Sequence, residues 1–291
     1  MESTKALIIF CEGAHDVAFL SRIFRTCENT TEVREKFSAY PAPFNQFFKT
    51  NVERHAAQDL TLDMAKKFFL PDKVFCNTEW MFLLFNSGGA SQYEKVKDFL
   101  KDFILLFDNA QNFPEGAKYV VQEVKYLFFY DADHRTPNDV AVLMQKEFNS
   151  IENTLWKLNE WEIITGTKGT TQEDKALYIW ANETGSGTLE DIILPIYNLK
   201  NADLLTKSTA FVSDAFDWSE AGKPNEQISK IRSSKSKATI CVAGQGLKPG
   251  APLSAIIHDN VLASSDAIKS DVNVKNLILF LNNFIGSELL K

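Results

Sequence analysis

The stretch ALIIFCEGAHDVAFL (residues 6–20) joins an apolar run to a helical pattern through a short acidic loop. Residues 7–10 are continuously apolar and a glycine follows closely, which predicts a buried strand. From about 14 to 25, apolar residues recur with helical spacing, which predicts a helix. Glu12 and Asp16 lie in and just after the loop, so they are either turn and capping residues or part of an active site.

Strand-like and helix-like segments alternate along the rest of the chain. Further strands are predicted at 80–86, 125–130, 161–165, 176–181 and 238–244, the last reading ATICVAG. Further helices are predicted at about 92–107, from Pro137 to about Phe148 with Thr136 and Asp139 as a capping box, from a cap at Thr188, and at 274–286 with Gly286 as the stop signal. This alternation predicts an α/β fold with a mostly parallel sheet and helices on both faces.

An aromatic-rich segment at about 31–79 separates the first two predicted strands. We interpret it as a partly helical insertion that docks on the body through phenylalanines: Phe44, Phe47, Phe48, Phe68 and Phe69. The core of the fold is then formed by residues 5–30 and 80–195, and a C-terminal elaboration follows at 196–291. We expect one elaborated domain, since even the polar segment 213–237 is not biased enough to be a clear linker.

The composition argues against several classes of protein. With 45% hydrophobic and 24% charged residues, the 291-residue chain has the composition of a soluble globular protein. Its net charge of −7 provides no overall basic field for nucleic acid. The four cysteines are scattered and no P-loop motif occurs, so we expect neither a zinc site nor a P-loop ATPase. The chain shows no membrane-length apolar run and no signal peptide, so we expect a cytoplasmic protein without membrane contact.

Acidic residues follow two of the first three predicted apolar strands. Glu12 comes after the first strand, with Asp16 four residues on, and Asp131-x-Asp133 comes after the third. Ligands of open parallel sheets bind at the carboxyl ends of the strands, and residues two apart in an extended segment point the same way. Convergent carboxylates repel one another unless a cation lies among them, and hard oxygen ligands suit Mg²⁺ or Mn²⁺.

Three short motifs follow the first three of these strands: Glu12-Gly13, Gly88-Gly89 and Asp131-x-Asp133. Their order resembles that of the Toprim domain, a fold shared by topoisomerases, bacterial primases, small RNA-maturation nucleases and the overcoming-lysogenization-defect (OLD) nucleases. The resemblance implies that Glu12 acts as general acid/base or metal ligand, and that Asp131 and Asp133 bind Mg²⁺. The glycines let the chain turn tightly beside a ligand.

The wider string CEGAHDVAFL is most similar to the OLD-type and standalone Toprim-like proteins. The resemblance implies a first metal held by Glu12, Asp131 and Asp133, and a second to which Asp16 contributes. GSGTLEDIILP resembles a later acidic element of those proteins, so Glu190 and Asp191 would complete the second metal site. OLD-type nucleases use a lysine near their metals, and Lys237 is the candidate for it here.

Each of these residues also has a purely structural interpretation. Glu12 can cap the following helix, and Asp16, Glu190 and Asp191 occupy first turns, where the helix dipole favours acids. Asp131 and Asp133 can be turn residues before the next helix.

The basic segment 223–237 has two interpretations as well. It carries five cations and one acid (5 − 1 = +4) in an acidic chain, which fits either a solvated loop or a strip contacting nucleic-acid phosphates through Lys230, Arg232 and Lys235.

These features lead to the hypothesis of a Mg²⁺- or Mn²⁺-dependent phosphodiester hydrolase of the Toprim type, acting on DNA or RNA. Standalone proteins of this kind resemble phage-defence effectors paired with a separate ATPase, which fits the missing P-loop. The alternative is a catalytically inactive Toprim-like module that binds nucleic acid or a partner. Phosphoryl or nucleotidyl transfer, as in primases, is the third possibility, but no primase zinc-binding module is visible.

Overall fold

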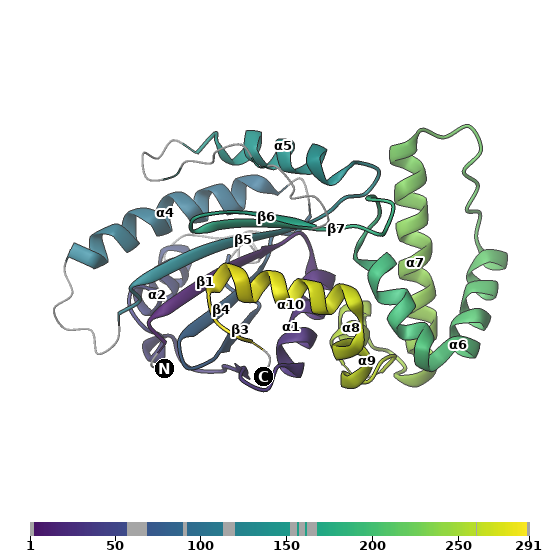
Figure 1. Cartoon of the computed structure of the whole chain (residues 1–291), viewed down its shortest axis with the longest axis horizontal. Helices are drawn as coiled ribbons and strands as arrows, with labels where there is room; N and C mark the ends of the chain where they lie inside the picture. Colours follow the sequence, from purple (N-terminus) through teal and green to yellow (C-terminus); the bar gives the residue numbers. More distant parts are fainter. Residues whose placement is uncertain are drawn as a thin grey trace.

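The structure is a computed structural model that describes residues 3–56, 69–89, 92–112, 120–151, 156, 161, 168–259 and 261–289. Its centre is a seven-stranded sheet in the order β2-β3-β4-β1-β5-β7-β6 (Figure 1). The strands are β1 (Lys5–Cys11), β2 (Thr31–Glu32), β3 (Lys73–Cys76), β4 (Trp80–Asn86), β5 (Glu123–Asp131), β6 (Gly169–Gln172) and β7 (Lys175–Trp180). The strands β4, β1, β5 and β7 run parallel, and the others are antiparallel additions at the two edges. The expected α/β fold with a mostly parallel sheet is confirmed.

Strand β1 lies in the middle of the sheet and pairs along its whole length with β4 and β5. Its side chains alternate between two hydrophobic clusters, with Leu7 and Ile9 on one face and Ile8 and Phe10 on the other. All four are fully buried. A parallel strand covered on both faces needs apolar side chains at every position, which explains the continuous run in the sequence.

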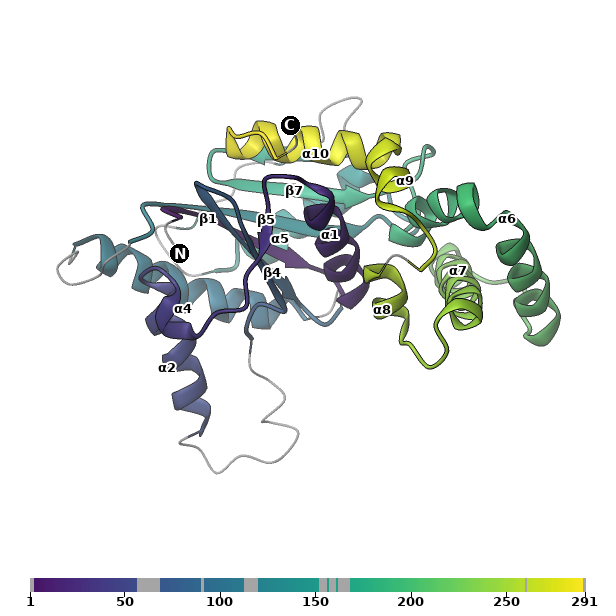
Figure 2. The same cartoon turned by 90° about the horizontal axis from the view of Figure 1, so that it is seen from below.

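Helices cover both faces of the sheet. One face carries α1 (Ala14–Thr26), α8 (Leu253–His258), α9 (Ser265–Ser270) and α10 (Val272–Ile285), whereas α2 (Phe44–Ala56), α4 (Tyr93–Asn112) and α5 (Pro137–Phe148) cover the other (Figures 1 and 2). The long helices α6 (Leu189–Ala215) and α7 (Asn225–Leu247) pack together beyond the carboxyl ends of the parallel strands (Figure 1). None of the helices in the described ranges has the length and hydropathy needed to cross a membrane.

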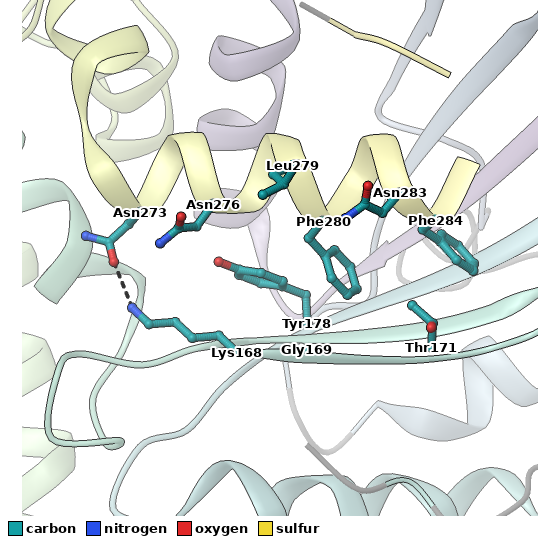
Figure 3. Close-up of a pocket in the computed structure, with 10 residues that line it drawn as sticks. All are labelled: Lys168, Gly169, Thr171, Tyr178, Asn273, Asn276, Leu279, Phe280, Asn283 and Phe284. Atoms are coloured by element: carbon teal, nitrogen blue, oxygen red, sulfur yellow. Dashed lines mark hydrogen bonds between the residues drawn. The ribbon is translucent and has the colours of Figure 1, made fainter. Parts of the chain in front are cut away.

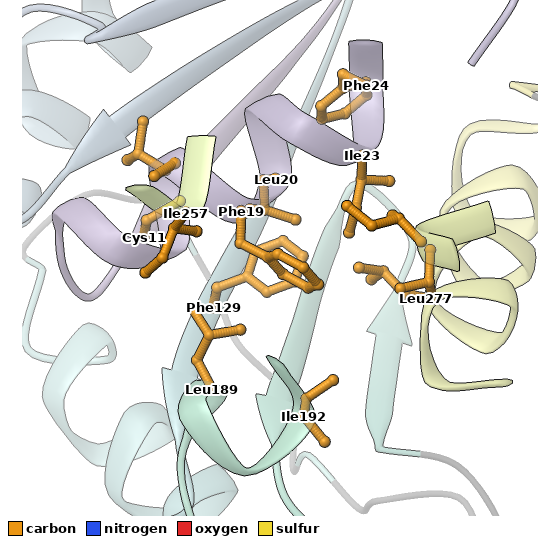
Figure 4. Packing of buried hydrophobic residues seen from close by; sticks show 14 of the residues in the cluster. Cys11, Phe19, Leu20, Ile23, Phe24, Phe129, Leu189, Ile192, Ile257 and Leu277 are labelled. Carbon is orange, nitrogen blue, oxygen red and sulfur yellow. The ribbon is translucent and has the colours of Figure 1, made fainter. Parts of the chain in front are cut away.

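The C-terminal helices are part of the core. Helix α10 lies across the β6–β7 hairpin (Figure 3), and its Leu277 joins the cluster beneath α1 (Figure 4). Phe19 and Ile23 of α1 and Phe129 of β5 belong to the same cluster. The segment 196–291 therefore completes one face of the sheet.

Local signals at several element ends are confirmed. Thr136 precedes α5, and its hydroxyl accepts a hydrogen bond from the Asp139 backbone N–H at 3.2 Å, while the Asp139 carboxylate accepts from the Thr136 backbone at 3.1 Å. Helix α10 ends at Gly286, whose φ of 66° is left-handed. The predicted strands at 80–86, 125–130 and 176–181 correspond to β4, β5 and β7.

The insertion at 31–79 is partly helical, as predicted, and also contributes β2, β3 and a short 3₁₀ turn (Phe37–Ala39). Phe44, Phe47 and Phe48 of α2 are buried in the cluster that α4 covers, and Phe69 stacks on Phe10 with ring centroids 6.2 Å apart. Phe68 and all but the first residue of the predicted strand at 161–165 lie outside the described residues.

Two predictions about the basic region are wrong. The segment ATICVAG is not a strand, and residues 225–237 are not a loop, because both belong to α7. The β-branched run resembles a strand, but its buried positions are Thr239, Ile240, Ala243 and Gly244. This spacing matches one face of a helix, and packing of that face overrides local strand propensity.

Candidate functional site

The carboxyl ends of β1 and β5 lie side by side at a switch point of the sheet. Helix α1 leaves β1 toward one face, whereas α5 leaves β5 toward the other, so the two loops diverge and leave space between them. Open α/β sheets bind ligands in such a crevice. Glu12 bridges it: its backbone N–H donates to the Phe129 carbonyl at 3.1 Å, and its Oε2 accepts from the Asp131 backbone N–H at 3.1 Å.

A cavity of about 390 Å³ opens at this point. The residues that it shares with the sequence prediction are Glu12, Gly13, Asp16, Gly88, Gly89, Asp131, Glu190 and Lys237. The other predicted site residues, Asp133, Asp191, Lys230, Arg232 and Lys235, are not among the residues that line it. The cavity thus brings together residues from the loop after β1, from α1, from the end of β4 and the loop after it, and from β5, α6 and α7.

Three carboxylates in the cavity are each held by a backbone N–H. Besides Glu12, the Oδ2 of Asp16 accepts from Gly13 at 2.8 Å and the Oδ1 of Asp131 accepts from Leu189 at 2.9 Å. Leu189 is the first residue of α6, so Asp131 lies at a helix N-terminus, where negative charge is favoured. The other oxygen of Asp16, Oδ1, is buried and makes no hydrogen bond of standard geometry among the described residues, although the Trp180 side chain acts on this carboxylate as a hydrogen-bond donor that lowers its pKa.

The three carboxylates share a high proton affinity. Burial raises the pKa of Asp16 to about 7, and repulsion by Glu12 adds to the effect. Burial, followed by repulsion from Asp16 and Glu12, raises the pKa of Asp131 well above its usual range. The pKa of Glu12 is raised mainly by burial, even though the Asp131 backbone hydrogen bond opposes the shift. Such a cluster retains protons near neutral pH unless a cation neutralises it.

Glu190 differs from these three because a histidine and a lysine side chain accompany it. The His15 Nδ1 lies 3.3 Å and the Lys237 Nζ 3.9 Å from its Oε1, and the Thr188 hydroxyl donates to its Oε2 at 2.9 Å. Burial alone would raise the pKa of Glu190, but these partners lower it below its usual value. His15 was missed by sequence reasoning, although its place between Glu12 and Asp16 in the first motif was a usable signal.

Asp133 and Asp191 take part in backbone hydrogen bonds around the site. Asp133 has a φ of 56° and exchanges two backbone hydrogen bonds of 2.7 Å with Gly187. This left-handed conformation breaks the extended alternation that was expected to aim it alongside Asp131. Asp191 accepts from the Thr188 backbone N–H at 2.8 Å and so caps α6, which is the structural interpretation of this residue.

The basic strip lies on α7, and two of its cations are already paired. Lys230 contacts Glu226 at 2.7 Å, and Arg232 makes a two-pronged contact with Glu220 at 2.9 and 2.7 Å. Both cations are exposed, and Lys235 is half-buried. Only Lys237 reaches the cavity, from the middle of a helix where a strand start was expected.

The donor set fits a hard divalent cation in its chemistry. Glu12, Asp16 and Asp131 offer carboxylate oxygens, the preferred ligands of Mg²⁺. In their present rotamers, no three histidine, cysteine or acidic side chains of the described residues form a group that could hold a metal ion. The chemistry of the donors therefore fits a divalent cation, whereas their present arrangement does not form a complete site.

Comparisons with known proteins add little. No family model and no curated protein matches this chain. Among solved structures, a hypothetical protein from Pyrococcus horikoshii OT3 is similar to it, with 12% sequence identity over 97% of this chain and 95% of that one and a TM-score of 0.42. This degree of similarity supports no conclusion about function.

Proposed function

We propose that this protein is a Mg²⁺- or Mn²⁺-dependent phosphodiester hydrolase of the Toprim type that acts on nucleic acid. The observation that carries the proposal is the convergence of Glu12, Asp16 and Asp131 in one cavity at the switch point of the sheet, with raised pKa values. Strongly perturbed carboxylates in a cleft are typical of functional sites, because folding alone gains nothing from their mutual repulsion.

Within this proposal, Glu12 and Asp131 hold the cation, and Asp16 contributes a further carboxylate oxygen. A divalent cation in such a site supplies an activated water molecule and neutralises charge on the leaving oxygen. The backbone N–H groups of Asp131, Gly13 and Leu189 keep the three carboxylates oriented toward the cavity. Lys237, whose Nζ lies 3.9 Å from the Oε1 of Glu190, would contact a phosphate oxygen of the substrate.

A cluster of cations near Asp133 supports a polyanionic substrate. Burial raises the pKa of Asp133, and Arg135, His134, Lys237 and Lys230 all act in the opposite direction, which puts these four groups in electrostatic range of one carboxylate. They come from two elements, the loop after β5 and helix α7. Lysine and arginine side chains bind backbone phosphates without reading bases, so this local cluster offsets the net acidity of the chain.

A partner ATPase belongs to the proposal as well. It rests on the resemblance to phage-defence effectors and on the absence of a P-loop motif from the sequence. Activity assays should therefore be run both with the chain alone and with any ATPase encoded beside it.

The test is cleavage of DNA and RNA in the presence of Mg²⁺ or Mn²⁺. Glu12→Gln and Asp131→Asn should each lower the cleavage rate by about 10²-fold or more. This loss corresponds to about 2.7 kcal/mol of transition-state stabilisation. Glu123→Gln is the matched control, since this substitution removes the same charge at the opposite end of the strand that carries Asp131. Wild-type cleavage rates in Glu12→Gln would refute the assignment.

A second measurement does not depend on activity. A cation that binds only the folded state raises the melting temperature by mass action. We expect millimolar Mg²⁺ or Mn²⁺ to raise the melting temperature of the wild type and of Glu123→Gln, and to have little effect on Asp131→Asn. An unchanged wild-type melting temperature would contradict the metal site itself, whatever the cleavage assay shows.

One observation favours the alternative, a catalytically inactive binding module. Glu190 is already contacted by His15 and Lys237 within the chain, which leaves fewer carboxylates for a second metal. Salt-dependent binding of DNA or RNA without cleavage, with both metals and the partner ATPase present, would support this alternative over the hydrolase.

A further inference from the structure

A second cavity differs from the one at the carboxylate cluster in its lining residues and in the elements that form it. It has a volume of about 360 Å³ and lies between the β6–β7 hairpin and α10 (Figure 3). It shares no residue with the cavity that contains Glu12. Small-molecule sites are concave spaces of roughly 300–1,000 Å³ that combine apolar walls with a few polar groups.

One end of this cavity is cationic. The Nζ of Lys168 donates to the Oδ1 of Asn273 at 2.8 Å (Figure 3). Burial lowers the pKa of Lys168, although Asp271 and Glu183 act in the opposite direction. No acidic residue lines the cavity among the described residues, so its lining carries a single positive charge and an anionic group would be attracted there.

The other end is aromatic. The rings of Tyr178 and Phe280 are in tilted contact, with centroids 5.2 Å apart and an angle of 57°, and Phe284 lies one turn further along α10. Tyr178 is almost completely buried, so the partly exposed Phe280 offers the more accessible ring. Aromatic walls of this kind pack against planar rings.

Amide side chains connect the two ends. Asn273, Asn276, Phe280 and Asn283 recur at intervals of three and four residues, which places them on one face of α10. An asparagine amide donates and accepts together, the pattern that reads the edge of a nucleobase. From Asn273 to Phe280 the helix advances by about 10 Å, so the cationic and aromatic ends are separated along the cavity.

We propose that this cavity binds a nucleoside monophosphate. Its phosphate lies at Lys168 and Asn273, and its base packs against Phe280, beside Tyr178, with an edge toward Asn283. The combination of one cation, three amides and aromatic rings matches a ligand with an anion at one end and a hydrogen-bonding planar ring at the other. This inference does not depend on the proposed hydrolase, because the two cavities have no residue in common.

The test is isothermal titration calorimetry on the full chain in EDTA, which removes any metal-mediated phosphate binding at the other cavity. The probes are AMP, GMP, CMP, UMP, the four nucleosides and inorganic phosphate. We expect saturable binding of at least one monophosphate, at least about tenfold tighter than its nucleoside or phosphate alone. Equal affinity for inorganic phosphate, equal affinity for the nucleoside, or no saturable binding would each overturn the proposal.

Variants locate the site. Lys168→Gln and Phe280→Leu should each weaken binding by about tenfold or more, since one removes the cation and the other the ring. Asn276 is exposed, so Asn276→Asp keeps the fold while placing a negative charge beside the phosphate, and it should weaken monophosphate binding more than nucleoside binding. Lys275→Gln is the control, because Lys275 is exposed on the same helix and does not line the cavity.

The set of variants keeps the test decisive even if one of them does not fold. Thermal unfolding of each variant shows whether it is folded, and Asn276→Asp is informative even if Phe280→Leu is unstable. Undiminished monophosphate binding in Lys168→Gln and Asn276→Asp would place the ligand elsewhere and overturn the assignment. Equal weakening by Lys275→Gln would do the same.

Discussion

Asp16 lies in the first turn of α1 with only 5% of its surface exposed. The helix dipole and the Gly13 N–H favour its charged form, whereas burial and the nearby Glu12 oppose it. Burial and repulsion prevail, and the pKa of Asp16 is raised to about 7. One oxygen of this carboxylate orients the loop by accepting from the Gly13 N–H.

This shift predicts an unusual dependence of stability on pH in the absence of divalent metal. The ordinary Asp value is 3.8 and the folded-state pKa is about 7, so the folded chain binds the proton more tightly than the unfolded chain. Stability should therefore fall as pH rises from about 4 to about 7, by up to the order of 4 kcal/mol for this group. Urea unfolding in EDTA across this range measures it.

Asp16→Asn provides the comparison. The amide keeps the size of the side chain and the oxygen that accepts from Gly13, but it does not titrate. The slope of stability against pH should therefore become shallower by the amount that corresponds to about one bound proton. A slope remains, because the pKa values of Glu12 and Asp131 are also raised. Identical slopes for the variant and the wild type would show that Asp16 does not carry the shift.

Helix α7 depends on a close contact with α8. A side chain on Gly244 would place its Cβ 2.6 and 2.7 Å from two carbons of Ile256, a buried residue of α8. Glycine in a helix interior normally costs about 1 kcal/mol relative to alanine, so this position is retained for packing. The contact attaches α7, and with it Lys237, to the body of the protein.

Gly244→Ala should therefore destabilise the fold by about 1–3 kcal/mol, because the overlap outweighs the gain in helix propensity. Gly246→Ala is the matched control: its Cβ would lie 3.7 Å from Leu204, an ordinary contact, and it should stabilise by up to about 1 kcal/mol. Chemical denaturation of both variants measures these effects. A gain in stability from Gly244→Ala would show that the two helices do not pack closely.

At the scale of the whole molecule, the C-terminal helices close one face of the sheet. Leu277 of α10 is fully buried in the cluster beneath α1, and Lys125 of β5 donates to the Phe284 carbonyl at 2.6 Å. Residues nearly 160 positions apart thus hold α10 to the sheet. The protein consequently needs its C-terminal segment for a complete core.

Leu277→Ala should destabilise the folded state by about 2–5 kcal/mol, the cost of a cavity in a packed core. Leu279→Ala removes the same atoms two residues further on, where the side chain is 60% exposed, and should change stability by no more than about 0.5 kcal/mol. Urea denaturation of the two variants makes the comparison. Similar effects from both would mean that α10 does not cover the sheet.

The sequence by itself determined the features that depend on neighbouring residues. The buried run of β1, the helical spacing of α1, the capping box at Thr136 and the left-handed stop at Gly286 are all local, and each was predicted. The rule that parallel strands expose ligand sites at their carboxyl ends was enough to select Glu12 and Asp131. Their function remains a prediction.

Only the tertiary structure decided which candidates meet. Lys237 reaches Glu190 because α7 packs along α6. The sequence of either helix alone does not predict this contact. The backbone of Asp133 leaves the extended conformation because it pairs with Gly187, more than 50 residues later. The run ATICVAG becomes helical because its buried face packs against other helices. In each case long-range packing outweighs local preference, since burying a side chain yields more free energy than its backbone propensity costs.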